Sequence, residues 1–269
     1  MIPRHTRCTC HTSPEHHANT PSLMLIFTHP LYNYNEHNPT PELTKFFDSS
    51  SSLWLNDWVS AHSAVRHSNG KIYVTTNLNG LYEIDPNSGG YRRVSQSTWA
   101  FCRLVSFENQ LLCFGSQLTV VDPATGASEI WMLGEGILDS YWSRSRAAAV
   151  HMDKIYVATQ SNCLYCIGSD RKATLVSSKH NWSTCSALLS WNGQLYATLG
   201  STLVTIDIED GTTELISGTK SHIQCGIIGQ DNNVYVISRN GSLYKLDSTK
   251  KELFSIIQKS SLGVASTMV

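Results

Sequence analysis

The sequence lacks long apolar runs and has no excess of charge of either sign. No apolar run approaches the length of a membrane span, and the N-terminus has no apolar segment of the signal-peptide type. Lys and Arg number 20 against 21 Asp and Glu, which gives a net charge of −1. A balanced charge indicates no basic surface, so we expect no nucleic-acid partner and no membrane partner. The protein is predicted to be cytoplasmic and monomeric.

Signatures of nucleophilic hydrolases are also missing. There is no Gly-x-Ser-x-Gly elbow and no Ser-His-Asp order of residues. The eight Cys are expected to be reduced thiols, because no secretion signal places the chain in an oxidising compartment. Cys8, Cys10 and His11 lack the spacing of a zinc site, and residues 1–22 are predicted to be a disordered N-terminal extension.

What the sequence does contain is a repeat of short strands. Its clearest unit runs from Trp182 to Asp210, where apolar runs are separated by turn signals such as Asn192-Gly193. Leu203 to Ile208 alternates with a period of two, as a strand does. Four short antiparallel strands in about 40 residues are typical of a propeller blade or a similar meander.

An incomplete unit stands near each end of the repeat. Leu23 to Phe47 matches the second to fourth strands of a unit, and Ser261 to Val269 matches a lone first strand. Joining the two would remove the exposed edges of an open array. We therefore predict an all-β fold over residues 23–269, a six-bladed β-propeller of four-stranded antiparallel blades. Its first blade would be closed by the C-terminal strand, Gly263 to Val269.

The phrases LYEIDPNSG and LTVVDPATG, with a Trp at the head of several units, resemble β-propeller repeat proteins of the Kelch and PQQ-like kinds. The glycine doublet of Kelch blades occurs only at Gly89-Gly90, and neither a Trp-Asp blade ending nor a sialidase-type Asp box is present. The resemblance implies a propeller that binds partners, but a fold does not by itself determine a function.

Two residue types recur at fixed places in the units. Small residues stand three places after each head, as expected near a crowded propeller axis: Ala61, Cys102, Ser145, Cys185, Cys225 and Ala265. An Asp follows the third strand in several units: Asp85, Asp122, Asp207 and Asp247. A repeated Asp is compatible with a metal or catalytic site, but repetition favours a turn in which the carboxylate accepts backbone N–H bonds. Cys163 and Cys166 form a CxxC that a strand would direct to opposite faces.

The candidate binding residues lie where the chain enters each innermost strand. The unit heads are Trp58, Trp99, Trp142, Trp182 and His222. They have two interpretations, an aromatic ring at the channel mouth that stacks on sugars or peptides, or packing between blades. One place further stand His62, Arg103, Arg146, Ser186, Gly226 and Ser266, with Tyr141 and Arg144 nearby. The arginines could hold a carboxylate or phosphate in the channel, or they could bond to backbone carbonyls.

These features favour a non-catalytic binding module with no catalytic residues, no metal and no cofactor. The leading hypothesis is a scaffold that binds a protein partner on one rim of the propeller. The first alternative is a lectin-like module that binds glycans through the Trp ring, with weak equivalent sites adding by avidity. The second is a metal-dependent hydrolase at the channel mouth, which would need carboxylates or His converging there.

Overall fold

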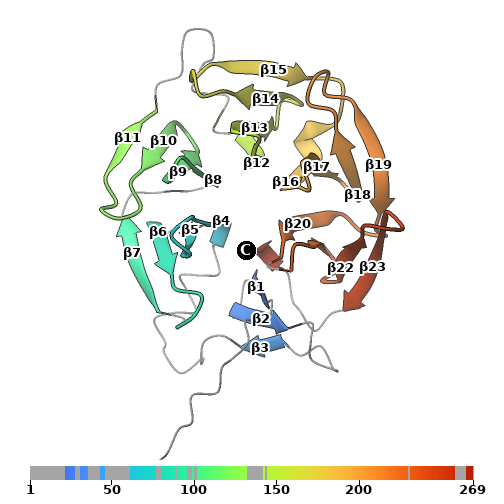
Figure 1. Ribbon diagram of the computed structural model, residues 1–269, viewed down its shortest axis with the longest axis horizontal. Coiled ribbons are helices and arrows are strands. Elements are labelled where there is room, and N and C mark those ends of the chain that lie inside the picture. Colours follow the sequence, from blue (N-terminus) through green and yellow to red (C-terminus); the bar gives the residue numbers. More distant parts are fainter. Residues whose placement is uncertain are drawn as a thin grey trace, which may run out of the picture.

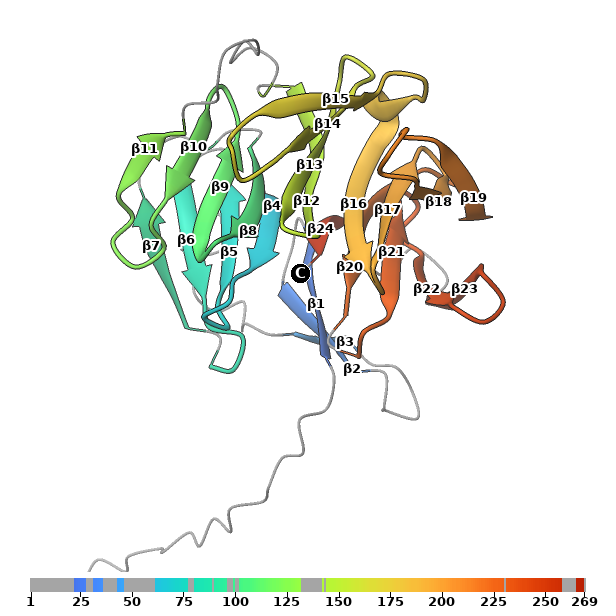
Figure 2. The ribbon, with the colours of Figure 1, turned by 45° about the horizontal axis from the view of Figure 1, so that its top comes forward.

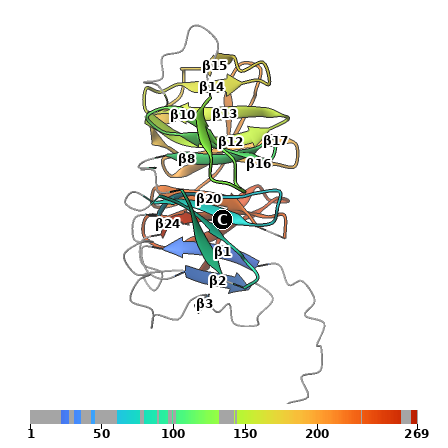
Figure 3. The ribbon, with the colours of Figure 1, turned by 90° about the vertical axis from the view of Figure 1, so that its left-hand side faces the viewer.

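The computed structural model describes the backbone and side chains of residues 61–76, 80–88, 90–95, 99, 102–131, 142, 144–229 and 231–256. It also gives the backbone of the strands at residues 22–27, 31–35, 43–45 and 265–268 and of residue 257. The strands group into four-stranded antiparallel sheets arranged in a ring (Figure 1). The tilted view shows the strands running from one face of the ring to the other (Figure 2). The view from the side shows that the ring is flattened (Figure 3).

Five of the sheets are blades built from consecutive strands, and each has its first strand nearest the centre of the ring. The first comprises β4 (Ala61–Arg66), β5 (Ile72–Thr76), β6 (Gly80–Ile84) and β7 (Tyr91–Ser95). The second comprises β8 (Arg103–Phe107), β9 (Gln110–Phe114), β10 (Leu118–Val121) and β11 (Ser128–Ile130). The third comprises β12 (Ser145–His151), β13 (Lys154–Thr159), β14 (Leu164–Ile167) and β15 (Ala173–Ser177).

The fourth comprises β16 (Cys185–Trp191), β17 (Gln194–Leu199), β18 (Thr202–Ile206) and β19 (Thr213–Gly218), preceded by a 3-10 turn η2 (Trp182–Thr184). The fifth comprises β20 (Ile223–Ile228), β21 (Val234–Ser238), β22 (Leu243–Asp247) and β23 (Glu252–Ile257). Every residue of β5 and β21 is buried, because the second strand of a blade has a neighbouring blade on each of its faces. The β-branched and aromatic residues of these strands suit such two-sided packing.

The predicted first blade differs from the other five in how much of it the structure describes. A further sheet has the order β24-β1-β2-β3, formed by β24 (Ala265–Met268), β1 (Ser22–Phe27), β2 (Leu31–Asn35) and β3 (Leu43–Lys45). Its strands are described by backbone pairing alone. Strand β24 pairs antiparallel with β1 and lies beside β20 and β4. The side-chain packing that the structure describes therefore covers five blades in place of the predicted six, and of the predicted closing strand, Gly263 to Val269, the structure describes Ala265–Met268.

Apolar seams between consecutive blades form the core. One seam joins Ala147, Tyr156 and Leu164 of the third blade to Leu188 and Ala197 of the fourth. Equivalent seams join the first blade to the second, the second to the third and the fourth to the fifth. Each blade thus buries both of its faces only with neighbours on both sides, as repeat architectures require.

The repeated Asp residues shape the outer hairpins. The Oδ1 atoms of Asp85, Asp122, Asp207 and Asp247 each accept a backbone N–H two residues further on, at 2.8 to 2.9 Å. This is the Asx turn that the repetition predicted. The turn interpretation of these carboxylates is confirmed.

Two of these hairpins rest on the preceding blade. A Cβ built on Gly126, at φ +74°, would lie 2.2 Å from the carbonyl oxygen of Val94 on β7. A Cβ built on Gly211, at φ +68°, would lie 2.3 Å from Cβ of Ser177 on β15. Glycine is required at both places, for its positive φ and for the close approach of the neighbouring blade.

We predict that Gly126→Ala lowers the thermal unfolding midpoint well below that of Gly193→Ala. Gly193 has φ +72° and no heavy atom within 4 Å of its built Cβ, so its variant measures backbone strain alone. That strain costs about 1–2 kcal/mol. Gly126→Ala must also displace the Val94 backbone and should cost about 1–3 kcal/mol more. Equal midpoints for the two variants would show that the hairpin can move away from β7 freely.

Candidate functional site

The Trp residues at the unit heads lie in the seams between blades. Trp142 and Trp182 have no exposed surface, and Trp99 is 5% exposed. Trp142 lies in the seam between the second and third blades, where its ring meets that of Phe114 edge-on with centroids 5.6 Å apart. Trp182 fills the next seam, between the third and fourth blades. The blade-packing interpretation describes these three side chains, whereas His222 is exposed and Trp58 lies outside the described residues.

The recurring small residues of the described blades are buried, although Cys225 stands two places beyond the position that Cys185 occupies in its own blade. Cys102, Cys185 and Cys225 are buried, and burial raises the pKa of their thiols to about 11, 12 and 12. A thiol with such a pKa carries little thiolate, so these cysteines act as small apolar residues. Cys163 and Cys166 are both free, without a disulfide between them.

A β-bulge lies near the start of four innermost strands. The register shifts between Ala61 and Ser63, between Ser145 and Ala147, between Cys185 and Ala187, and between Ile223 and Cys225. The residue left out of each ladder is half-buried, while the residues on both sides of it are buried. The bulged residues are His62, Arg146, Ser186 and Gln224. A bulge redirects a side chain, and these four, with Arg103 at the start of β8, form what we call the channel ring.

Arg103 links three neighbouring innermost strands. Its Nη1 donates to the carbonyl oxygen of His62 on β4 at 3.1 Å, and its Nε donates to the carbonyl oxygen of Arg146 on β12 at 2.6 Å. Carbonyls displaced from a ladder by a bulge need other donors when they are partly buried. Ser186 bonds to the next innermost strand, because its Oγ donates at 2.8 Å to the carbonyl of Ile223, the residue before the bulge of β20. The carbonyl-bonding interpretation therefore applies to Arg103.

Arg146 and Gln224 differ from Arg103, because buried polar atoms in their side chains have no partner. The Nε of Arg146 and the Oε1 of Gln224 are both buried without a hydrogen bond. Burial and the neighbouring Arg146 charge lower the pKa of Arg103 to about 10, so the two guanidinium groups repel each other. No carboxylate of the described residues pairs with either guanidinium.

His62 completes this part of the channel ring. Burial, and then the positive charge of Arg103, lower the pKa of His62 to about 4. The imidazole is therefore neutral at physiological pH. The described part of the channel ring thus carries its positive charge on Arg103 and Arg146.

The last described blade departs from the positions that sequence spacing predicted. Strand pairing places Ile223 opposite Ser238, as Cys185 lies opposite Leu199. The ring position is therefore Gln224, while a Cβ on Gly226 would meet Ala187 and Leu189 of the neighbouring blade at 3.3 Å. The same register moves the unit head from His222 to Lys220. The sequence spacing was counted from His222 and therefore missed this shift of two residues. The shift is visible only in the pairing of β20 with β21.

The other predicted site residues fall outside the channel ring. Arg144 is exposed where the chain enters β12, and Gln160 donates its backbone N–H to the Arg144 carbonyl at 2.8 Å. Tyr141 and the side chain of Ser266 lie outside the described residues.

The two faces of the propeller differ in charge. We call the face where the innermost strands begin the connection face. It is formed by the described parts of the links between blades and by the turns between second and third strands: Gly115–Gln117, Arg144, Gln160–Cys163, Ser178–Thr184, Gly200–Ser201, Thr219–His222 and Arg239–Ser242. Within these segments stand the exposed cations Arg144, Lys179, Lys220 and Arg239, and neither Asp nor Glu occurs there.

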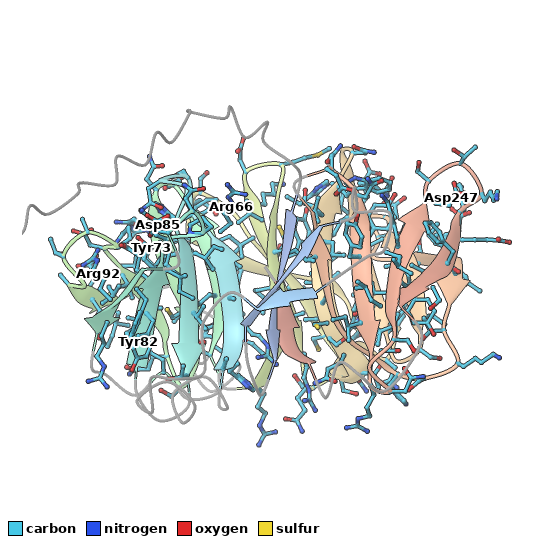
Figure 4. The ribbon with its side chains drawn as sticks, turned by 90° about the horizontal axis from the view of Figure 1, so that it is seen from below. Arg66, Tyr73, Tyr82, Asp85, Arg92 and Asp247 are labelled. Carbon is cyan, nitrogen blue, oxygen red and sulfur yellow. The ribbon has the colours of Figure 1, made fainter. Side chains whose placement is uncertain are left out.

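The opposite face, which we call the hairpin face, holds carboxylates that are paired. The Nζ of Lys71 lies 2.7 Å from Asp85 and holds the pKa of that carboxyl at about 2. Arg92 donates two bonds to Glu83, at 2.8 and 3.0 Å. Figure 4 shows Asp85 and Asp247 at the same end of the molecule. None of the four connection-face cations has an ion pair with a described residue.

Comparison with known proteins supports the fold. No family model matches the chain, and no curated protein matches it. Among solved structures, one of a nidogen/laminin complex has a TM-score of 0.73 at 8% identity and covers 92% of this chain and 97% of its own. Virginiamycin B lyase from Staphylococcus aureus has a TM-score of 0.57 at 12% identity, covering 77% of this chain and 73% of its own.

A further similar structure is the extracellular domain of a protein described as a one component system from B. thetaiotaomicron. Its TM-score is 0.58 at 13% identity, and the match covers 93% of this chain but 36% of that one. The chain thus spans about a third of that relative. Identities this low show a shared β-propeller fold and no shared function. The Kelch and PQQ-like resemblance stays a prediction.

These relatives also correct the predicted location. Three of the similar structures are extracellular domains of bacterial proteins. The cytoplasmic location predicted from the N-terminal sequence is therefore not retained, because this fold also occurs outside cells. The described residues include no helix with the length and hydropathy needed to cross a membrane.

The low pKa of His62 predicts a pH dependence. The folded pKa is about 4 and the ordinary value is 6.5, so between these values the unfolded chain binds more protons. Stability should therefore fall as the pH drops from about 6.5 to about 4. We expect His62→Gln to flatten this part of the curve of unfolding midpoint against pH. Parallel curves for wild type and variant would assign the acid sensitivity to other groups.

Proposed function

We propose that the chain is a non-catalytic binding module that recognises an acidic region of a protein partner through its connection face. The observation that carries the proposal is the separation of charge between the two faces. The net charge of −1 does not reveal this separation of charge. The carboxylates of the described residues all lie away from the connection face. Complementary potentials guide association and favour one orientation of a partner.

The exposed cations are available for binding. Arg144, Lys179, Lys220 and Arg239 lie on successive links and turns around one face, with exposed side chains and no ion pair to a described residue. Binding an acidic partner would break no existing salt bridge at these positions. Each exposed pair formed would contribute about 0.2–1 kcal/mol, so several must act together.

A protein partner is favoured over nucleic acid. Single strands bind proteins through basic grooves in which bases stack on exposed aromatic rings. The described aromatic residues at this face, Trp142 and Trp182, are buried in the seams. The described part of the face therefore offers cations without an exposed Trp, Tyr or Phe ring, and His222 is its exposed imidazole.

The predicted alternatives have less support. The lectin hypothesis needs exposed Trp faces, whereas Trp99, Trp142 and Trp182 are buried. The hydrolase hypothesis needs converging metal ligands, and the described residues contain no group of three or more His, Cys, Asp or Glu that could hold a metal ion. A glycan-array measurement on the folded protein would revive the lectin hypothesis if it detected binding.

The test is a titration of the protein with a fluorescein-labelled oligoglutamate peptide, followed by anisotropy. We expect the triple variant Lys179→Gln, Lys220→Gln, Arg239→Gln to bind about tenfold more weakly, because three pairs together contribute about 1–3 kcal/mol. Binding by the wild type should weaken as salt rises.

The matched control removes three exposed lysines from the hairpin face, by Lys154→Gln, Lys172→Gln and Lys251→Gln. It changes net charge equally and should leave peptide affinity within about twofold. Equal losses in both triple variants would show a general charge effect and refute a face-specific site. Tighter binding of a single-stranded oligonucleotide of the same charge would assign the face to nucleic acid.

A further inference from the structure

The channel ring contains an arginine with a buried donor for which the described residues provide no acceptor. Arg103 bonds to two carbonyl oxygens and thereby holds β4, β8 and β12 together. Arg146 stands at the equivalent place on the next strand, and its Nε is buried without a partner. A buried donor left unsatisfied is costly, and in a native protein it calls for an explanation such as an unoccupied binding site.

We propose that the channel ring binds a carboxylate group, with the Arg146 guanidinium as its principal donor. The inference rests on the proposed function in one respect, since the connection face would deliver an acidic ligand to the channel mouth. The β-bulge takes Arg146 out of the ladder, and the Nε of its side chain has no hydrogen-bond partner. A guanidinium presents a planar fork that matches the two oxygens of a carboxylate.

The charges around the channel ring favour an anion there. Arg103 and Arg146 repel each other, and the neutral His62 adds no positive charge. A bound carboxylate would neutralise this repulsion, which no carboxylate of the described residues does. The partly buried setting strengthens the interaction, because water screens it less than at the outer rim.

Gln224 provides a second unused group in the same ring. It occupies the bulge of β20, and its Oε1 is buried without a hydrogen bond. A turned amide would present its NH₂ in that place, and the two orientations are hard to distinguish from atomic positions. Ser186 lies on the strand between them and is already committed to Thr198 and the Ile223 carbonyl. Arg146 and Gln224 are therefore the ring residues with a buried polar atom that lacks a partner.

The experiment titrates glutarate, a small dicarboxylate, into the ¹⁵N-labelled protein and follows the arginine Nε–H signals. The Arg146 signal is assigned by its disappearance in Arg146→Lys. We expect saturable binding with a Kd of about 1 mM and a shift of the Arg146 signal. Arg146→Gln should weaken glutarate binding by about tenfold or more, and Arg146→Lys should weaken it as well, because lysine lacks the bidentate fork.

Lys172→Gln is the matched control, because it removes one exposed charge from the opposite, hairpin face. It should change glutarate affinity by about twofold at most, since exposed charges are screened. An unchanged unfolding midpoint shows that each variant is folded, and Gln224→Leu supplies a second ring variant that should also weaken binding. If glutarate binds Arg146→Gln as well as the wild type, or fails to bind the wild type, the proposal is overturned.

Two further arms identify the ligand. Inorganic phosphate that binds about tenfold more tightly than glutarate would overturn the assignment to a carboxylate. Oligoglutamate binding that weakens in Arg146→Gln would place the carboxylate on the partner. Peptide binding that persists while glutarate binding is lost would assign the channel ring to a free organic acid. The proposed function fails separately, through the connection-face triple variant, whose outcome does not depend on glutarate.

Discussion

Each blade of this propeller has two apolar faces and therefore depends on both neighbours. Seams between consecutive blades bury residues from both sides, and a Trp fills three of the described seams, with Trp99, Trp142 and Trp182 almost or wholly buried. A four-stranded sheet alone would leave one or both faces in water, so the ring is the smallest unit that buries them. The Trp residues that recur at the unit heads therefore contribute to the packing between blades.

The inner edge of the ring has a different constraint. Strands that converge on an axis leave little room, and bulges at four of the innermost strands relieve the crowding while displacing carbonyls from the ladder. Arg103 satisfies two of these carbonyls, those of His62 and Arg146. Ser186 donates to the carbonyl of Ile223, the residue before the bulge of β20. Equivalent positions on two strands therefore differ in role. Arg103 on β8 bonds to neighbouring strands, whereas Arg146 on β12 has a buried Nε without a hydrogen-bond partner.

Charge is organised on the scale of the whole molecule. On the hairpin face, carboxylate oxygens accept hydrogen bonds from backbone N–H groups of the Asx turns. Other carboxylate oxygens of this face pair with lysine or arginine. The connection face uses glycine, serine and asparagine in its turns and leaves its cations exposed. The propeller can therefore present a basic face although its net charge is −1.

The sequence by itself determined the repeat, the antiparallel strands and the Asx turns, because these depend on alternation and on turn chemistry within about ten neighbouring residues. It also predicted buried small residues on the innermost strands, although the register puts Ile223 in the place that spacing gave to Cys225. Only the tertiary structure decided the rest. The blade count depends on how sheets pack, the ring position of Gln224 depends on a register set by its partner strand, and the basic face depends on which turns point the same way. These are relations between residues distant in sequence, so no local pattern records them.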